Sequence, residues 1–185
     1  MKKSLKLSAL LLSTAVATLG FSGVTNAAGT LSGQIGVTLT IGTGCSIANS
    51  STTATNTWGS LDFGSYADLR NTIDGSVMGT GGTSGLQVTC TNGLAYSLSL
   101  DGGLNEDTNS LRNVFDTASS TAVPYRLYSD ATRSTEIASG GTLSFTGTGN
   151  LVSIPIYGRI LPSDQSQVAP TQGTYVDTIT ATVMW

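Results

Sequence analysis

The stretch Leu31-Ser-Gly-Gln-Ile-Gly-Val-Thr-Leu-Thr-Ile41 alternates between two kinds of residue along its whole length. Its odd positions carry apolar side chains or glycine, and its even positions carry Ser, Gln, Gly and Thr. Alternation with a period of two is typical of a β-strand with one buried face. Because this strand would lie close to the start of the exported chain, it could complete its own sheet or the sheet of another molecule.

The residues before this stretch predict a secretory signal peptide over residues 1–27. Three lysines among the first six residues form a basic start, and a mainly apolar run follows from Leu7 to Phe21. Small residues favour cleavage after Ala27, with Ala28 as the alternative. The apolar run is too short, and too often interrupted by Ser and Thr, for a membrane span. We therefore expect an exported chain with a strand segment over 28–42 and one domain over 43–185.

The composition favours an extracellular β-rich protein over a nucleic-acid-binding one. Only 10% of the 185 residues are charged. All three lysines lie in the predicted signal peptide, which leaves five arginines against eleven carboxylates and a net charge of −6. Nucleic-acid binding depends on basic patches, and a mildly acidic, lysine-free surface argues against them; we expect no nucleic-acid partner.

Short alternating runs, separated by clusters of Gly, Asn, Asp and Ser, predict an all-β sandwich. Strands are expected over 61–63, 86–90, 94–100, 123–128, 143–145, 151–160 and 174–185. Asn92-Gly93 suits a two-residue type I′ turn, so we expect the second and third of these strands to form a hairpin. The glycine-rich stretch 75–85 is predicted to be a loop, and the spacing of Leu111, Val114 and Phe115 predicts one turn of helix.

The two cysteines are expected to form a disulfide. Cys45 and Cys90 are the only cysteines in the sequence, and an exported chain matures under oxidising conditions. Two separate buried thiols are the alternative. In the chain-entropy model, closing this loop stabilises the fold by roughly 4 kcal/mol.

The sequence offers little that could support catalysis. It contains no histidine, which removes the commonest general base and the commonest zinc ligand. Asp101, Glu106 and Asp107 could pair for glycoside hydrolysis, but a solvated turn is the favoured explanation. The same loop offers oxygen ligands for calcium at Asp101, Asn105, Asp107 and Asn109, but it lacks the glycine and the terminal Glu of an EF-hand loop. Trp58 and Tyr128 could stack on sugars, whereas a tryptophan in a strand is more often part of a core. We expect no enzyme activity, no cofactor and no metal site.

Several segments together resemble the spore coat protein U domain, which is typical of archaic, Csu-type chaperone–usher pilus subunits. The segments are Leu61-Asp-Phe-Gly-Ser-Tyr66, Leu86-Gln-Val-Thr-Cys-Thr91, Val123-Pro-Tyr-Arg-Leu-Tyr-Ser-Asp130, Ile154-Pro-Ile-Tyr-Gly-Arg159 and Gly173-Thr-Tyr-Val-Asp-Thr-Ile179. The resemblance extends from about Gly29 to Trp185. The stretch after Arg133 lacks the Trp-Gly-Asp-Gly of many relatives, and the loop 164–172 matches loosely, which leaves the detail of these loops open.

The resemblance implies an incomplete immunoglobulin-like β-sandwich that is completed by donor-strand exchange. In such pilins a periplasmic chaperone fills an apolar groove first. At the outer-membrane usher, the N-terminal strand of the next subunit replaces the chaperone. The donor residues implied here are Leu31, Ile35, Val37, Leu39 and Ile41. The residues implied for the strand that borders the groove and contacts the chaperone are Tyr175, Ile179, Ala181, Val183 and Trp185.

The resemblance thus implies a structural pilin of a surface fimbrium, exported through the periplasm and serving attachment and biofilm formation. Its expected partners are copies of itself or related pilins, the chaperone and the usher. A self-complemented coat protein, whose strand completes its own sheet, is the alternative. A secreted sugar-binding module that uses Trp58 is a third reading.

Overall fold

A computed structural model of the chain describes residues 30–48 and 56–185. The predicted signal peptide and its cleavage site lie outside the described residues. The chain divides into two units, residues 1–39 and Thr40–Trp185, which are described separately. None of the described residues belongs to a helix that is long and apolar enough to cross a membrane.

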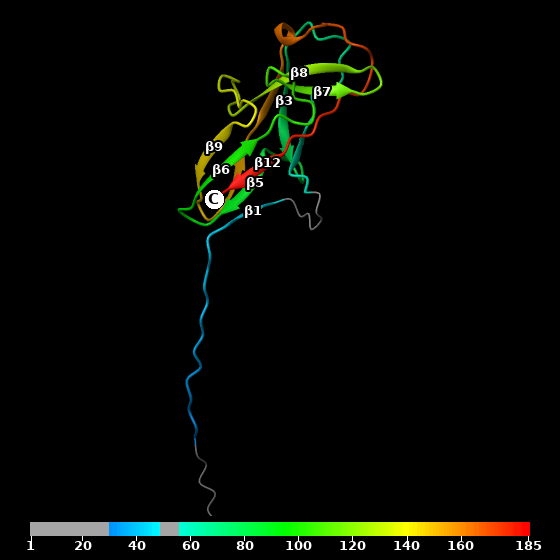
Figure 1. The fold of residues 1–185 in the computed structure, drawn as a ribbon. Helices are drawn as coiled ribbons and strands as arrows, with labels where there is room; N and C mark the ends of the chain where they lie inside the picture. The colour runs from blue at the N-terminus through cyan, green and yellow to red at the C-terminus, as the bar shows by residue number, and fades with distance from the viewer. Residues whose placement is uncertain (1–29, 49–55) are drawn as a thin grey trace, which may run out of the picture. The chain divides into compact units, whose positions relative to one another are not determined.

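The described part of the first unit, together with the residues that follow it to Thr43, has no strand partner among the described residues (Figure 1). Its large apolar side chains are between 80% and 100% exposed: Leu31, Ile35, Val37, Leu39 and Ile41. Since a β-strand is defined by backbone hydrogen bonds to a neighbour, the alternating stretch carries the pattern of a strand without yet forming one.

The second unit is all-β, as expected, and its strands pair antiparallel in three sheets (Figure 1). The first sheet has the order β1-β5-β10, the second β2-β3-β11-β8-β7 with β4 on β3, and the third β12-β6-β9. The strands are β1 (Cys45–Ile47), β2 (Gly59–Leu61), β3 (Ile73–Gly79), β4 (Thr83–Ser84), β5 (Leu86–Cys90), β6 (Ala95–Leu100), β7 (Arg112–Asp116), β8 (Thr121–Tyr128), β9 (Thr142–Thr146), β10 (Leu151–Ile154), β11 (Tyr157–Ile160) and β12 (Ala181–Met184). One 3₁₀ turn, η1 (Pro162–Asp164), follows β11.

One apolar core joins the three sheets. Each sheet contributes inward-facing residues with almost no exposure, among them Val88 from β5, Leu98 from β6, and Leu127 from β8. These residues alternate with more exposed neighbours along their strands, as the burial patterns of β5 and β6 show. The period-two signal in the sequence therefore predicted the inward faces correctly.

The predicted hairpin at Asn92-Gly93 is wrong. β5 and β6 belong to different sheets, so the two strands do not pair with each other. A turn does occur there, because the Leu94 amide donates to the Thr91 carbonyl at 3.0 Å. Of the two central residues, however, only Gly93 has a positive φ, whereas a type I′ turn requires positive φ at both.

Two further local predictions are also wrong. Residues 112–116 form β7 instead of a helical turn, because pairing with β8 from Arg112↔Tyr125 to Asp116↔Thr121 outweighs a weak helical spacing. Most of the expected loop 75–85 is strand, since β3 extends to Gly79 and β4 follows at Thr83. Gly79 permits this close pairing: a Cβ there would lie 2.3 Å from the Gly85 carbonyl oxygen.

The expected strands 151–160 and 174–185 are both shorter in the structure. Pro155 divides the first into β10 and β11, which join different sheets, because proline cannot donate to a ladder. In the second, the regular ladder is confined to β12. Upstream of β12, the segment is attached at single points: Val176 forms a bridge with Phe115, and Thr180 bonds to Asp101.

A buried arginine fixes the end of β6, the strand that carries β12. Arg112 is 2% exposed, and its guanidinium donates to four backbone carbonyl oxygens. Two belong to Leu100 and Asp101 at the end of β6, and two to Ile137 and Ala138. Burial lowers the pKa of Arg112, and these four bonds satisfy the donors that burial removes from water.

Replacing Gly85 with alanine should destabilise the domain strongly. Gly85 has a positive φ, and a Cβ there would lie 2.5 Å from the Ile154 carbonyl oxygen. Backbone strain and overpacking together predict a loss of about 2–4 kcal/mol in the free energy of unfolding, measured by urea denaturation. Gly81→Ala is the matched control, because Gly81 also has a positive φ but has no atom near the added Cβ. It should cost about 1 kcal/mol; equal losses in the two variants would contradict the packing argument.

Candidate functional site

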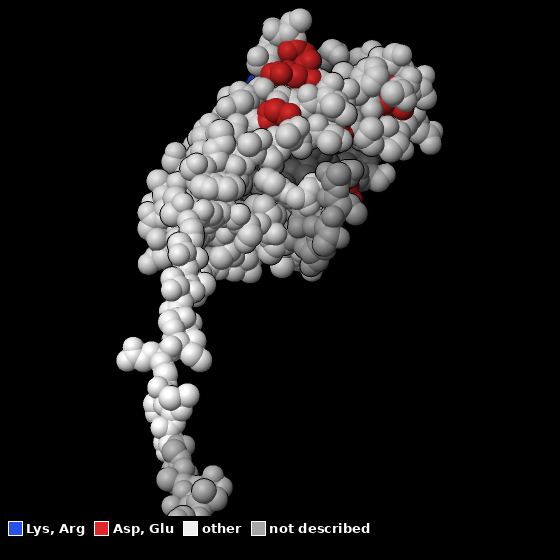
Figure 2. Space-filling model, turned by 60° about the horizontal axis from the view of Figure 1, so that its bottom comes forward, with Lys and Arg blue, Asp and Glu red and all other residues white. Residues whose placement is uncertain are grey.

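The candidate site is a groove in the second unit with a volume of about 1750 Å³. Two chain segments far apart in the sequence form its walls: residues 56–69 are the first wall and residues 170–181 are the second wall. The view in Figure 2 shows a mostly uncharged face with small groups of acidic side chains around a hollow.

The floor of the groove is the hydrophobic core itself. All but one of the floor residues are apolar, and they come from β3, β5, β6, β7, β8 and β11 and the residues beside them. They are Ile73, Val77, Leu86, Leu100, Val114, Val123, Tyr125, Leu127, Ile156 and Ile160. Eight of these ten residues are at most 5% exposed, so the floor is an apolar lining that is already largely shielded from water.

The first wall is attached to the sheet largely by side chains. β2 pairs with β3 over three residues. Leu61 at the end of β2 and Phe63 beyond it lie over Gly158, where a Cβ would be 2.6 Å from Leu61 Cδ1 and 2.8 Å from Phe63 Cζ. The Phe63 ring also meets the Tyr125 ring edge-on at 5.8 Å. A glycine on β11 thus creates the space in which this wall packs.

The second wall presents one face to the core and the other to solvent. The half-buried residues that pack against the core are Tyr175, Ile179, Ala181 and Val183. The residues that alternate with the last three of them, Thr180, Thr182 and Met184, are exposed. Trp185, which the sequence places on the same face, is 62% exposed.

One backbone edge of the second wall is engaged, and the other faces the groove. The Val176 N–H and C=O both bond to Phe115, and the Thr180 carbonyl accepts from the Asp101 N–H at 3.1 Å. Successive residues of an extended chain direct their backbone groups to opposite sides. Those of Asp177 and Ile179, which line the groove, therefore point away from β6 and β7. With respect to the described residues, this is an open strand edge, able to pair with a further strand.

A polar pair interrupts the apolar lining. The Tyr125 hydroxyl donates to Asp177 Oδ2 at 2.7 Å. Asp177 Oδ1 accepts from the Leu104 N–H and from Asn105 Nδ2. Burial, together with the bond to the Asp177 carboxylate, raises the pKa of Tyr125 far above its usual range. The pair ties the second wall to β8 and to the loop after β6. Sequence reasoning missed Asp177, although an acidic residue inside an alternating apolar strand was a visible signal.

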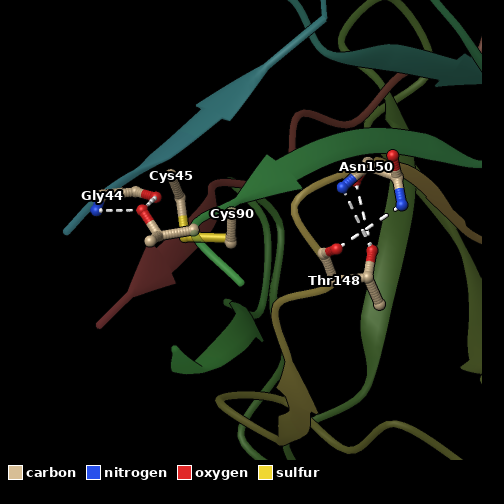
Figure 3. Close-up of a disulfide and its surroundings, with 6 residues drawn as sticks. Gly44, Cys45, Cys90, Thr148 and Asn150 are labelled. Carbon is tan, nitrogen blue, oxygen red and sulfur yellow. Dashed lines mark hydrogen bonds between the residues drawn. A yellow bond between two sulfur atoms is a disulfide. The ribbon is translucent and has the colours of Figure 1, made fainter. Parts of the chain in front are cut away.

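The two cysteines are joined, which confirms the expected disulfide (Figure 3). Cys45 and Cys90 are directly opposite each other in the register of β1 and β5. The residues beside them are also bonded: the Gly44 N–H donates to Thr91 Oγ1 at 3.1 Å, and the Thr91 N–H donates to the Gly44 carbonyl at 3.0 Å. Residues 44 and 45 are therefore firmly attached where the chain enters the domain.

The other candidate sites from the sequence have structural partners in the fold. Asp101 accepts from the Gly103 and Thr180 amides, and Asp107 accepts from the Asn109 and Leu111 amides, as in ordinary turns. No group of His, Cys, Asp and Glu among the described residues could hold a metal ion. Of the two aromatic candidates for sugar stacking, Tyr128 is buried and Trp58 packs against the core.

Replacing Tyr125 with phenylalanine should weaken the second wall. The variant loses a hydrogen bond to a carboxylate, which predicts a decrease of about 2 kcal/mol in the free energy of unfolding at pH 7. Because the folded-state pKa of Tyr125 is raised, its stabilising effect is complete below pH 10 and is lost as the pH rises further. Urea denaturation between pH 8 and 11 should therefore show a smaller alkaline loss in the variant than in the unmodified chain.

Tyr66→Phe is the control for this substitution, because Tyr66 is 58% exposed. It should change the free energy of unfolding by less than about 0.5 kcal/mol at pH 7. If Tyr125→Phe changes stability no more than this control does, the polar pair does not hold the second wall.

Comparisons with known proteins agree with this architecture. No curated protein matches the chain. Among solved structures, the chain resembles one chain of the CsuC–CsuE chaperone–tip adhesion subunit pre-assembly complex from archaic chaperone–usher Csu pili of Acinetobacter baumannii. The identity is 17% and the TM-score 0.50; the match covers 79% of this chain but only 40% of that one. The likeness supports the immunoglobulin-like fold. The family model of the spore coat protein U domain matches residues 31–182, and the chain therefore belongs to the spore coat protein U domain family.

Proposed function

We propose that this chain is a structural subunit of an archaic chaperone–usher pilus and polymerises by donor-strand complementation. In this proposal residues 28–42 are the donor segment, and residues 43–185 form the domain that accepts the donor segment of the next copy. The observation that carries the proposal is the coexistence, in one chain, of an open apolar groove and an unpaired segment with an alternating apolar face.

The energetics favour covering the donor face. Ile35, Val37, Leu39 and Ile41 are each at least 80% exposed. Burying a branched apolar side chain contributes about 1.5–3 kcal/mol, so the four together would contribute roughly 6–12 kcal/mol before ordering costs. Left in water, the donor face and the groove are both aggregation hazards, and each is the natural cover for the other.

The open edge of the second wall would supply backbone hydrogen bonds to the donor segment. A donor strand that enters the groove would bond to the backbone groups of Asp177 and Ile179. Addition of a strand to a sheet edge derives its affinity from such main-chain bonds and its specificity from pockets for alternate side chains. The alternating apolar positions of the donor segment suit that arrangement.

The same groove would require a temporary partner before polymerisation. We infer that a periplasmic chaperone covers it first and that an outer-membrane usher exchanges the chaperone for the donor segment of the next subunit. The assembled fibre would lie at the cell surface and serve attachment and biofilm formation. Membership of the spore coat protein U domain family supports this assignment. So does the solved chaperone–subunit complex whose fold this chain shares.

A charge on the apolar face of the donor segment should prevent polymerisation. Val37→Asp would carry a carboxylate into the groove, where it would lose its hydration without gaining a partner. Thr38→Asp is the matched control, because it places the same charge on the opposite face of the same segment. Electron microscopy and size-exclusion chromatography should detect fibres with the control but only chaperone-bound subunits with Val37→Asp. Equal polymerisation of the two variants would contradict insertion of the apolar face.

A deletion distinguishes exchange between copies from self-complementation. A chain lacking residues 29–41 should form a soluble 1:1 complex with its chaperone that never polymerises. A synthetic peptide of residues 29–42 should then displace the chaperone and fill the groove. If the truncated chain folds alone as a stable monomer, the donor segment is not required and the proposal fails. If the truncated chain is unstable and no chaperone rescues it, the segment completes its own domain.

A further inference from the structure

The chain enters the folded domain at one firmly attached point. Gly44 is bonded to Thr91 through both its N–H and its C=O, and Cys45 begins β1. Cys45 is covalently joined to Cys90 at the end of β5. Figure 3 shows these residues together at the edge where β1 meets β5. Any force transmitted along residues 30–43 reaches the domain here.

Two short strands lie on either side of residues 49–55, which are outside the described residues. β1 is three residues long, and β2, at the start of the first wall, is also three residues long. Each strand pairs with a single neighbour, β1 with β5 and β2 with β3. Without a crosslink, tension at Cys45 would break the few bonds of β1 and then pull on residues 56–61, which border the groove.

The crosslink offers a stronger path. β5 lies between β1 and β10 in its sheet, and its inward residues Leu86, Val88 and Cys90 are 4%, 1% and 3% exposed. A force that passes through the disulfide bypasses residues 46–89 entirely, because those residues lie inside the covalent loop. The tension is then borne by a strand that is anchored on both edges and in the core.

We propose that the Cys45–Cys90 disulfide is a load-bearing link that keeps tension in the N-terminal segment away from the first wall of the groove. The proposal rests on the proposed function, because only a polymerised subunit is pulled through its donor segment. Its role is distinct from stabilisation: a disulfide elsewhere could restore the free energy of unfolding but could not redirect the force.

Single-molecule force spectroscopy on the chain with its groove filled by a synthetic peptide of residues 29–42, held by handles at its two ends, tests this proposal. The unmodified chain should show no early release of residues near Cys45. In Cys45→Ser/Cys90→Ser, residues 45–58 should detach before the main unfolding event. This adds an early extension of about 50 Å, at up to about 3.6 Å per residue. Any detachment of β12 from the other end should occur in both chains and provides an internal reference.

A relocated disulfide separates load transfer from stability. Ser60→Cys/Met78→Cys, added to the double serine variant, joins residues that are opposite each other in the β2–β3 register and exposed at the surface. It should restore folding if the double serine variant does not fold. It should still show the early extension, because the new link lies beyond residues 45–58.

The outcomes are decisive in both directions. If the relocated variant resists force as the unmodified chain does, with no early extension, the load-bearing role of Cys45–Cys90 is wrong. Because the measurement uses single chains, it does not depend on polymerisation. A chain that shows the expected load path but never polymerises would refute the proposed function alone, and a polymerising chain without this load path would refute only this inference.

Discussion

The structure depends on one apolar core, which a groove between two walls reaches. Three sheets share this core, and most of its residues are buried as in any sandwich. Between residues 56–69 and 170–181, however, a groove reaches this core. The polar pair Tyr125–Asp177 and the buried Arg112 maintain the second wall and its support in position around this opening.

Much of the fold could be predicted because period-two patterns depend only on which face of a strand is buried. The alternation in 86–90, 94–100 and 123–128 corresponds to β5, β6 and β8, with their inward faces as expected. What failed was connectivity. Asn92-Gly93 is a strong local signal for a hairpin, but a turn sequence cannot reveal whether the next strand joins the same sheet or crosses to another. The sequence also did not reveal that the strands on either side of Pro155 join different sheets, because the whole fold determines their ladder partners.

Like the fold, the groove could be predicted from the sequence only in part. The apolar faces of its components were visible in the sequence, including residues 31–41 and 175–183. The way in which the first wall is attached was not, because it depends on Gly158 lying beneath Leu61 and Phe63, more than 90 residues away in sequence. Asp177 was overlooked for a related reason. Its carboxylate is acceptable in an apolar strand only because Tyr125, Leu104 and Asn105 supply donors from distant positions.

The separation of the two walls has a kinetic consequence. The walls are about 100 residues apart in the sequence, and the strands that carry the second wall, β6 and β7, belong to different sheets. Closing such long loops is entropically costly, and folding slows as contacts become less local. The acceptor surface should consequently be one of the last parts of the domain to mature. During that delay the chain would be most vulnerable to misassembly, so the order of its folding steps matters as much as its final stability.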